Sequence, residues 1–164
     1  MTTSSGSQLA QGIRQKIDEL KETCRGVDEN TACRAPKDRW SPKEILSHLL
    51  GPKESSHLPI FQLFLDKETP TIEIDPGNPF YSEMRAQRTF AHLLLEVEEE
   101  YERISTFAEG LSDEQLARNA HVPELKESPL GDYPTLELMI KGLGQYHVQM
   151  HIDQMREILQ EVNG

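Results

Sequence analysis

The stretch WSPKEILSHLL, residues 40–50, contains a complete signal for the start of a helix. Ser41 is a predicted N-cap, Pro42 stands at the first helical position, and Glu44 follows Ser41 at the spacing of a capping box. In the helix that begins here, His48 shares the inner face with apolar residues. This stretch therefore predicts a helix that brings an imidazole into a protein core.

Two other segments repeat apolar residues at spacings of three and four, which is the period of an amphipathic helix. The first follows a predicted N-cap at Ser7 and comprises Leu9, Ile13, Ile17, Leu20 and Cys24. The second comprises Phe90, Leu94, Val97, Tyr101, Ile104 and Ala108. The acidic run EVEEEYE, residues 96–102, is predicted to be the solvent face of the second helix.

Turn-forming residues separate these helices. Gly51, Pro52 and Pro59 predict a break in the helix that begins at Ser41, and residues 66–80 are rich in turn residues. A second capping box, Ser112 with Gln115, predicts a short helix. Residues 118–134 are expected to be an irregular connection, which either borders a site or permits a non-sequential helix order.

The last predicted helix, residues 135–162, has two histidines on its inner stripe. The stripe comprises Leu136, Ile140, Leu143, His147, Met150, His151, Gln154 and Ile158. Imidazoles four residues apart project together and can share one cation, although such pairs also arise by chance. The spacing alone is a weak sign of a metal site.

Composition narrows the classes of function. A chain of 164 residues is predicted to form one domain, residues 1–164, and its apolar runs are shorter than the ~20 residues that cross a bilayer. The net charge of −11 argues against a nucleic-acid partner. Cys24 and Cys33 form no recognisable redox motif, and no leader is apparent, so we expect a cytoplasmic protein with free thiols. The sequence neither predicts nor excludes a homodimer.

His48 strengthens the metal hypothesis, because helix bundles build metal sites from side chains on facing helices. Buried imidazoles are costly to desolvate, and one shared cation would satisfy three lone pairs. Three neutral nitrogens favour zinc, with nickel, iron and manganese as alternatives. Three protein ligands also leave a position for water or substrate, which is typical of a catalytic site. His57, His92 and His121 are predicted not to be ligands.

Two motifs in this chain resemble the DinB/YfiT-like superfamily. They are W-S-x-x-E-x-x-x-H, formed by Trp40, Ser41, Glu44 and His48, and H-x-x-x-H-x-x-Q, formed by His147, His151 and Gln154. The resemblance covers essentially the whole chain in helix order. It implies an all-α fold, a four-helix bundle with a long crossover, in which His48, His147 and His151 bind a divalent metal ion.

The resemblance implies an enzyme more than a particular reaction. The superfamily includes S-transferases that use low-molecular-weight thiols such as bacillithiol, thiol-dependent isomerases, proteins regarded as hydrolases, and many of no known activity. Residues 148–150 are Val-Gln-Met, so the glutamate of the H-E-x-x-H metalloproteases is absent. A metal deprotonates a coordinated thiol without a separate base, which favours a thiol S-transferase acting on a small-molecule substrate. A metal-dependent hydrolase and a non-catalytic metal- or ligand-binding bundle are the alternatives.

Several neighbours of the histidines have two interpretations. Gln154 either orients His151 or a bound water, or forms an ordinary hydrogen bond between helices. Gly142 and Gly144 indicate close helix packing or a cavity beside His147. Trp40 is predicted to cap the bundle, and Tyr146 to line the pocket or to face solvent. The side chains of Leu143, Met150 and Ile158 are expected to hold a hydrophobic electrophile beside the metal.

Overall fold

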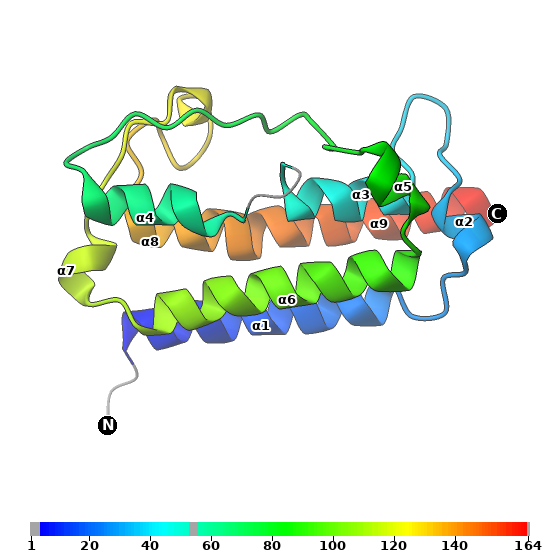
Figure 1. Cartoon of the computed structure of the whole chain (residues 1–164), viewed down its shortest axis with the longest axis horizontal. Coiled ribbons are helices and arrows are strands. Elements are labelled where there is room, and N and C mark those ends of the chain that lie inside the picture. Colours follow the sequence, from blue (N-terminus) through cyan, green and yellow to red (C-terminus); the bar gives the residue numbers. More distant parts are fainter. Residues whose placement is uncertain (1–3, 53–55, 164) are drawn as a thin grey trace.

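The computed structural model describes residues 4–52 and 56–163. Within these residues the regular elements are helices, and there is no strand (Figure 1). The four sides of a bundle are formed by α1 (Ser5–Thr23), by α3 (Pro42–Leu50) with α4 (Leu58–Asp66), by α6 (Phe90–Glu109), and by α8 (Leu136–Lys141), the π-helix η2 (Gly142–His147) and α9 (Val148–Asn163). The shorter elements are α2 (Glu29–Ala32), α5 (Glu83–Gln87), α7 (Asp113–Leu116) and the 3-10 turn η1 (Pro123–Leu125). The predicted all-α four-helix bundle is confirmed.

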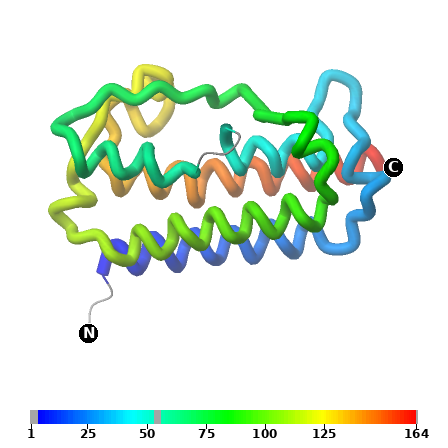
Figure 2. The backbone as a smooth tube through the Cα atoms, viewed as in Figure 1, coloured from blue at the N-terminus to red at the C-terminus, as the bar shows by residue number. Residues whose placement is uncertain are grey.

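Helices that follow one another in the sequence are not neighbours in this bundle. Both α1 and α3 pack against α6 and α9, so the first two sides lie diagonally opposite each other. Figure 2 shows the chain after α4 running back along the length of the bundle before it enters α6. This segment, residues 67–89, is called the crossover below and is the long connection that the resemblance implied.

The capping predictions are confirmed at two helices and wrong at a third. In α3, Ser41 Oγ accepts from the Glu44 amide at 3.2 Å, and the Ser41 amide donates to Glu44 Oε1 at 3.1 Å. The capping box of α7 is also complete. However, α1 is capped by Ser4, whose Oγ accepts from the Ser7 amide at 3.1 Å, so Ser7 lies in the first turn. The helix starts ahead of its apolar stripe because Ser4 supplies the cap.

The core confirms the predicted inner face of α1 and corrects that of α6. Leu93, rather than Leu94, is fully buried, because α6 packs against both α1 and α3 and buries a wider face than one stripe. Glu100, predicted to face solvent, is only 4% exposed. Its carboxylate accepts from Ser56 Oγ and from the His57 amide, just before α4. The predicted break in this side of the bundle is confirmed by the ends of α3 and α4, although residues 53–55 lie outside the described residues.

The last side of the bundle is not the continuous α-helix that its stripe predicted. A π-helix such as η2 has more residues per turn than an α-helix, so the buried face after it shifts along the sequence. Met150 is therefore 56% exposed instead of buried, while Ile152 and Met155 are buried. A Cβ on Gly144 would lie 2.6 Å from Ile13 Cγ1, which confirms close packing as the reason for this glycine.

Among the described residues, no helix is both long enough and apolar enough to cross a membrane.

Candidate metal site

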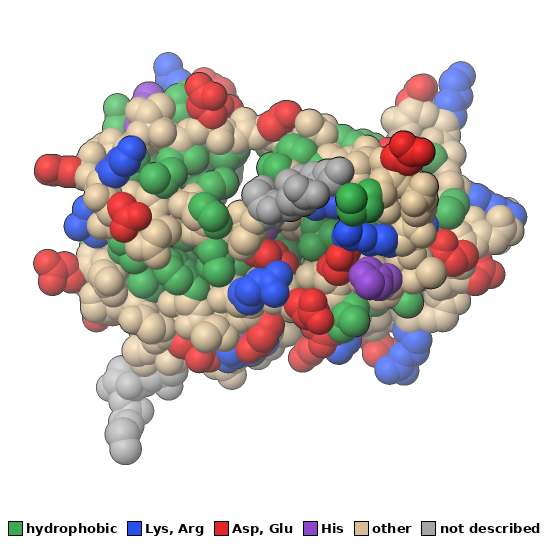
Figure 3. Space-filling view, viewed as in Figure 1, with side chains coloured by type: hydrophobic (Ala, Val, Ile, Leu, Met, Phe, Trp, Pro, Cys, Tyr) green, Lys and Arg blue, Asp and Glu red, His purple; other side chains and the backbone are tan. Residues whose placement is uncertain are grey.

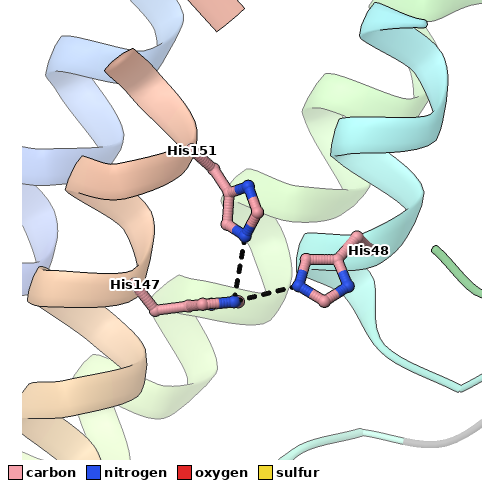
Figure 4. A group of neighbouring side chains, drawn as sticks. All are labelled: His48, His147 and His151. Atoms are coloured by element: carbon pink, nitrogen blue, oxygen red, sulfur yellow. Dashed lines mark hydrogen bonds between the residues drawn. The ribbon is translucent and has the colours of Figure 1, made fainter. Parts of the chain in front are cut away.

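Three imidazoles from two sides of the bundle converge, as Figure 4 shows. His48 comes from α3, His147 ends η2 and His151 lies on α9. The Nε2 atom of His147 is 2.9 Å from His48 Nε2 and 3.0 Å from His151 Nε2. Two ligands at 2.1 Å from one tetrahedral zinc ion are ~3.4 Å apart, so these separations are close to those that a shared ion requires.

Two of these imidazoles are held in the tautomer that a metal requires. His48 Nδ1 lies 2.6 Å from the main-chain oxygen of Asn78, and His151 Nδ1 lies 2.7 Å from Gln154 Oε1. Both partners are acceptors, so each Nδ1 carries the hydrogen and each Nε2 presents a lone pair. The two lone pairs point toward His147. Gln154 therefore orients His151, which decides between the two interpretations of its role.

His147 lies between two lone pairs and cannot satisfy both. Its Nε2 can donate at most one hydrogen, and its buried Nδ1 has no hydrogen-bond partner among the described residues. A single cation at the centre would accept all three lone pairs. The donor set thus fits a divalent metal ion.

Burial keeps the cluster neutral near pH 7. Desolvation, with a contribution from its neighbours, lowers the pKa of His147 to about 3, and desolvation lowers the pKa of His151 to about 4. Burial also lowers the pKa of His48. A shared proton is therefore disfavoured as the central cation, whereas neutral imidazole is the form that binds metals.

Two aromatic rings pack against the cluster. The ring centroid of Trp40 lies 4.9 Å from that of His48 and 6.1 Å from that of His151. Phe80 of the crossover stacks nearly parallel to His48, with centroids 6.2 Å apart. Trp40 thus contacts the proposed ligands, a role more specific than the predicted cap.

Arg85 fixes the crossover to the end of α3. Its side chain is only 6% exposed, and Nη1 donates to the main-chain oxygens of Ser47 at 3.0 Å, Gly51 at 2.6 Å and Phe80 at 3.1 Å. The same segment carries Asn78, the partner of His48. Sequence reasoning missed Asn78 and Phe80, because they lie in an irregular segment where no periodicity identifies contacts, and missed Arg85, because its helix α5 is too short to show a period.

A cavity of about 490 Å³ adjoins the cluster and has His48 and His147 in its wall. Its other walls come from α4, the crossover, the connection 118–134 and η2, and most of the lining side chains are apolar. The crossover and the connection are joined by two main-chain hydrogen bonds, Ile72 N to His121 O and His121 N to Pro70 O, both 2.8 Å. Figure 3 shows a hollow between the crossover and helices α3 and α4.

The cavity confirms only part of the predicted apolar surroundings. Leu143 and Tyr146 line it, but Met150 and Ile158 do not. Met150 faces solvent because of the π-helix, and Ile158 is buried in the bundle core.

The remaining histidines and the cysteines lie outside the cluster. His57 lines the cavity, but its Nε2 donates to Leu49 O at 2.9 Å. His92 is exposed on α6, and His121 stacks on Tyr133 in the connection. Both cysteines are free, and burial raises the pKa of the Cys24 thiol to about 12.

Comparison with known proteins identifies the fold. No family model matches the chain, and no match was found among curated proteins. Among solved structures, YfiT from Bacillus subtilis matches with a TM-score of 0.75 at 20% sequence identity, over 99% of this chain and 90% of that chain. YfiT is described as a probable metal-dependent hydrolase with an unusual four-helix bundle topology. The chain described above therefore has the YfiT-like four-helix bundle fold that its motifs predicted.

Proposed function

We propose that this protein binds one divalent metal ion through His48, His147 and His151 and acts as a metal-dependent enzyme on a small molecule. The observation that carries the proposal is that two of the three clustered histidines, His48 and His147, lie in the wall of a cavity. Structural zinc sites are closed by four protein ligands, whereas catalytic sites keep a position open. Zinc is the first candidate for the metal, and nickel, iron and manganese are the alternatives.

Thiol S-transfer is the reaction that we propose. A divalent ion bound to the three histidines would lower the pKa of a coordinated thiol enough to make it a thiolate at neutral pH. Among the described residues, no carboxylate is hydrogen-bonded to any of these histidines, so none of these carboxylates is in place as a base for them. Instead, the apolar wall would hold an electrophile and exclude water from the reacting groups.

Hydrolysis is the second candidate, and the observation that favours it is the likeness in fold to YfiT. A hydrolase would need a group to accept a proton from water. Glu73 and Asp75 are the lining carboxylates among the described residues, and both belong to the crossover.

An assay of the metal-loaded, untagged protein distinguishes these reactions. Bacillithiol, mycothiol, glutathione and coenzyme A are each combined with an uncharged aryl halide, and hydrolysis of an aryl ester is followed in parallel. We expect thiol conjugation above the rate of metal-free protein, and its loss in His147→Ala. Hydrolysis without conjugation would establish the second candidate, and inactivity in both assays would indicate a non-catalytic bundle.

A further inference from the structure

Among the described residues, the charged groups in the cavity wall all have one sign. Glu73 and Asp75 line the cavity, and no lysine or arginine does so within residues 4–52 and 56–163. The two carboxylates flank Ile74, whose side chain belongs to the apolar wall. A molecule in the cavity would therefore contact an apolar surface and an acidic segment of the crossover.

Asp75 is exposed, but a hydrogen bond holds its carboxylate in place. Asn78 Nδ2 donates to Asp75 Oδ2 at 3.0 Å, while the main-chain oxygen of Asn78 accepts from His48 Nδ1. Asn78 Oδ1 in turn accepts from the Phe80 amide at 2.7 Å. One residue thus links the acidic segment, an aromatic wall residue and a proposed metal ligand.

His57 adds a further acceptor to this wall. Its Nε2–H is bonded to Leu49 O, and burial lowers its pKa, so the ring is neutral and its other nitrogen can only accept a hydrogen bond. The cavity therefore combines apolar side chains with carboxylates and an acceptor imidazole.

We propose that this cavity prefers small molecules with an apolar body and an uncharged or cationic polar group, and that Glu73 and Asp75 weaken the binding of carboxylates and phosphates that do not coordinate the metal. The inference rests on the proposed function, because it concerns the substrate of the same site. Its physical basis is Coulomb repulsion of anions by the two carboxylates, which are exposed and therefore act through solvent. It favours an uncharged thiol, or an amine-bearing electrophile, over dicarboxylate thiols.

Binding of three matched probes tests the selection without requiring catalysis. Octylamine, 1-octanol and octanoate share one chain and differ in charge, and calorimetry on metal-free protein avoids coordination of octanoate to the metal. We expect octylamine to bind about tenfold more tightly than octanoate at low salt, with octanol between them. The difference should narrow at high salt, because exposed carboxylates are screened.

A charge-neutral variant gives the decisive comparison. In Glu73→Gln with Asp75→Asn, the amide at position 75 can still accept from Asn78, so the variant removes charge and keeps this hydrogen bond. Octylamine and octanoate should then bind within about twofold of each other. The control is Glu99→Gln, an equal change in charge per residue on the exposed part of α6, which should retain the full selection.

Three results would overturn the inference: octanoate binding as tightly as octylamine, unchanged selection in the double variant, or binding of none of the probes. Zinc titration and thiol conjugation on the same preparation test the proposed function separately. Zinc binding without charge selection would contradict only this inference, and charge selection without zinc binding would contradict only the proposed function.

Discussion

The chemistry of the three histidines follows from their burial and from hydrogen-bond partners that fix the tautomers of two of the rings. Asn78 and Gln154 each accept from an Nδ1, which leaves the Nε2 lone pairs of His48 and His151 directed at His147. Desolvation keeps the rings neutral, and the metal-free cluster has more lone pairs than hydrogens to satisfy them. At this scale the site is incomplete without a cation.

The stability of the metal-free protein should depend on pH through these rings. The pKa values of His147 and His151 in the folded chain, about 3 and about 4, lie below the ~6.5 of an unfolded histidine. Between these values the unfolded chain binds more protons, so the free energy of unfolding falls as pH falls below ~6.5 and does not depend on these rings above it.

Urea denaturation near pH 7.5 and near pH 5 measures this loss, which we expect to be on the order of 2 kcal/mol for each such histidine. The loss should shrink in a double variant, His147→Gln with His151→Gln. The exposed His92 provides the control, since His92→Gln should keep the wild-type pH dependence. If the free energy of unfolding changed equally with pH in the double variant and the wild type, the loss could not be assigned to His147 and His151.

Gln154 should affect metal affinity without being a ligand. Gln154→Ala removes the acceptor of His151 Nδ1, so the ring loses its fixed tautomer and orientation. We expect zinc affinity to fall by about tenfold in a competition titration. Gln160→Ala, at an exposed position on the same helix, should leave the affinity unchanged. A wild-type affinity in Gln154→Ala would show that the hydrogen bond does not orient the ligand.

The elements that position the cluster are the π-helix η2 and the crossover. The π-helix lies against α1 at a point where Gly144 leaves no room for a side chain. The crossover supplies Asn78 and Phe80 to His48 and is fixed to α3 by Arg85. Each element can be tested by a single substitution.

Gly144→Ala should destabilise the fold although alanine is the better helix former. The new Cβ would meet Ile13 Cγ1 at 2.6 Å and Cδ1 at 2.8 Å, and Ile13 is fully buried. Overpacking of this kind costs about 1–3 kcal/mol, which exceeds the gain of ~1 kcal/mol in helix propensity. Urea denaturation should show a net loss, whereas Gly110→Ala, with its nearest neighbour at 3.7 Å, should show none. A more stable Gly144→Ala protein would contradict the packing.

Arg85→Gln should weaken both the fold and the metal site. The substitution leaves the main-chain oxygens of Ser47, Gly51 and Phe80 without their charged donor. We expect the free energy of unfolding to fall by about 2–4 kcal/mol, and zinc affinity to fall by about tenfold as the crossover loosens around His48. Arg25→Gln, at an exposed ion pair, is the control. Unchanged zinc affinity in a folded Arg85→Gln protein would contradict the positioning role.

Local sequence patterns predicted the elements better than their junctions. The capping box at Ser41 was predictable because both partners lie within one turn, and the stripe of α1 was predictable because that helix is regular. The exposure of Met150 was not, since the predicted stripe assumed a continuous α-helix and the π-helix changes its phase. Glu100 was misassigned because its partners lie before α4, far away in the sequence.

The same contrast holds within the candidate site. Placing each histidine on the predicted inner face of its helix was enough to predict the cluster of His48, His147 and His151, without any knowledge of tertiary contacts. Their orienting partner Gln154 lies one turn away on the same helix and was a candidate from the sequence. Asn78 and Arg85 were not candidates, because neither the irregular part of the crossover nor its short helix α5 has a period from which a contact can be inferred.

The arrangement of the whole molecule makes the cluster a bridge between two sides of the bundle. His48 belongs to α3, whereas the other two histidines belong to the η2–α9 side, and the crossover spans the length of the bundle beside them (Figures 1 and 4). A metal ion held by all three would bind the folded chain in preference to the unfolded chain and so stabilise the fold. The central claim is that these three side chains bind one ion together.

Zinc stoichiometry tests that claim most directly. Untagged protein and its His48→Ala and His92→Ala variants are dialysed against buffered zinc and analysed for metal content, with circular dichroism to confirm that each variant is folded. The wild type and the His92→Ala control should each retain about one zinc ion per chain, and His48→Ala should retain far less, because a two-histidine site binds zinc much more weakly. Equal zinc content in folded His48→Ala and wild-type protein, or no zinc in the wild type, would contradict the account.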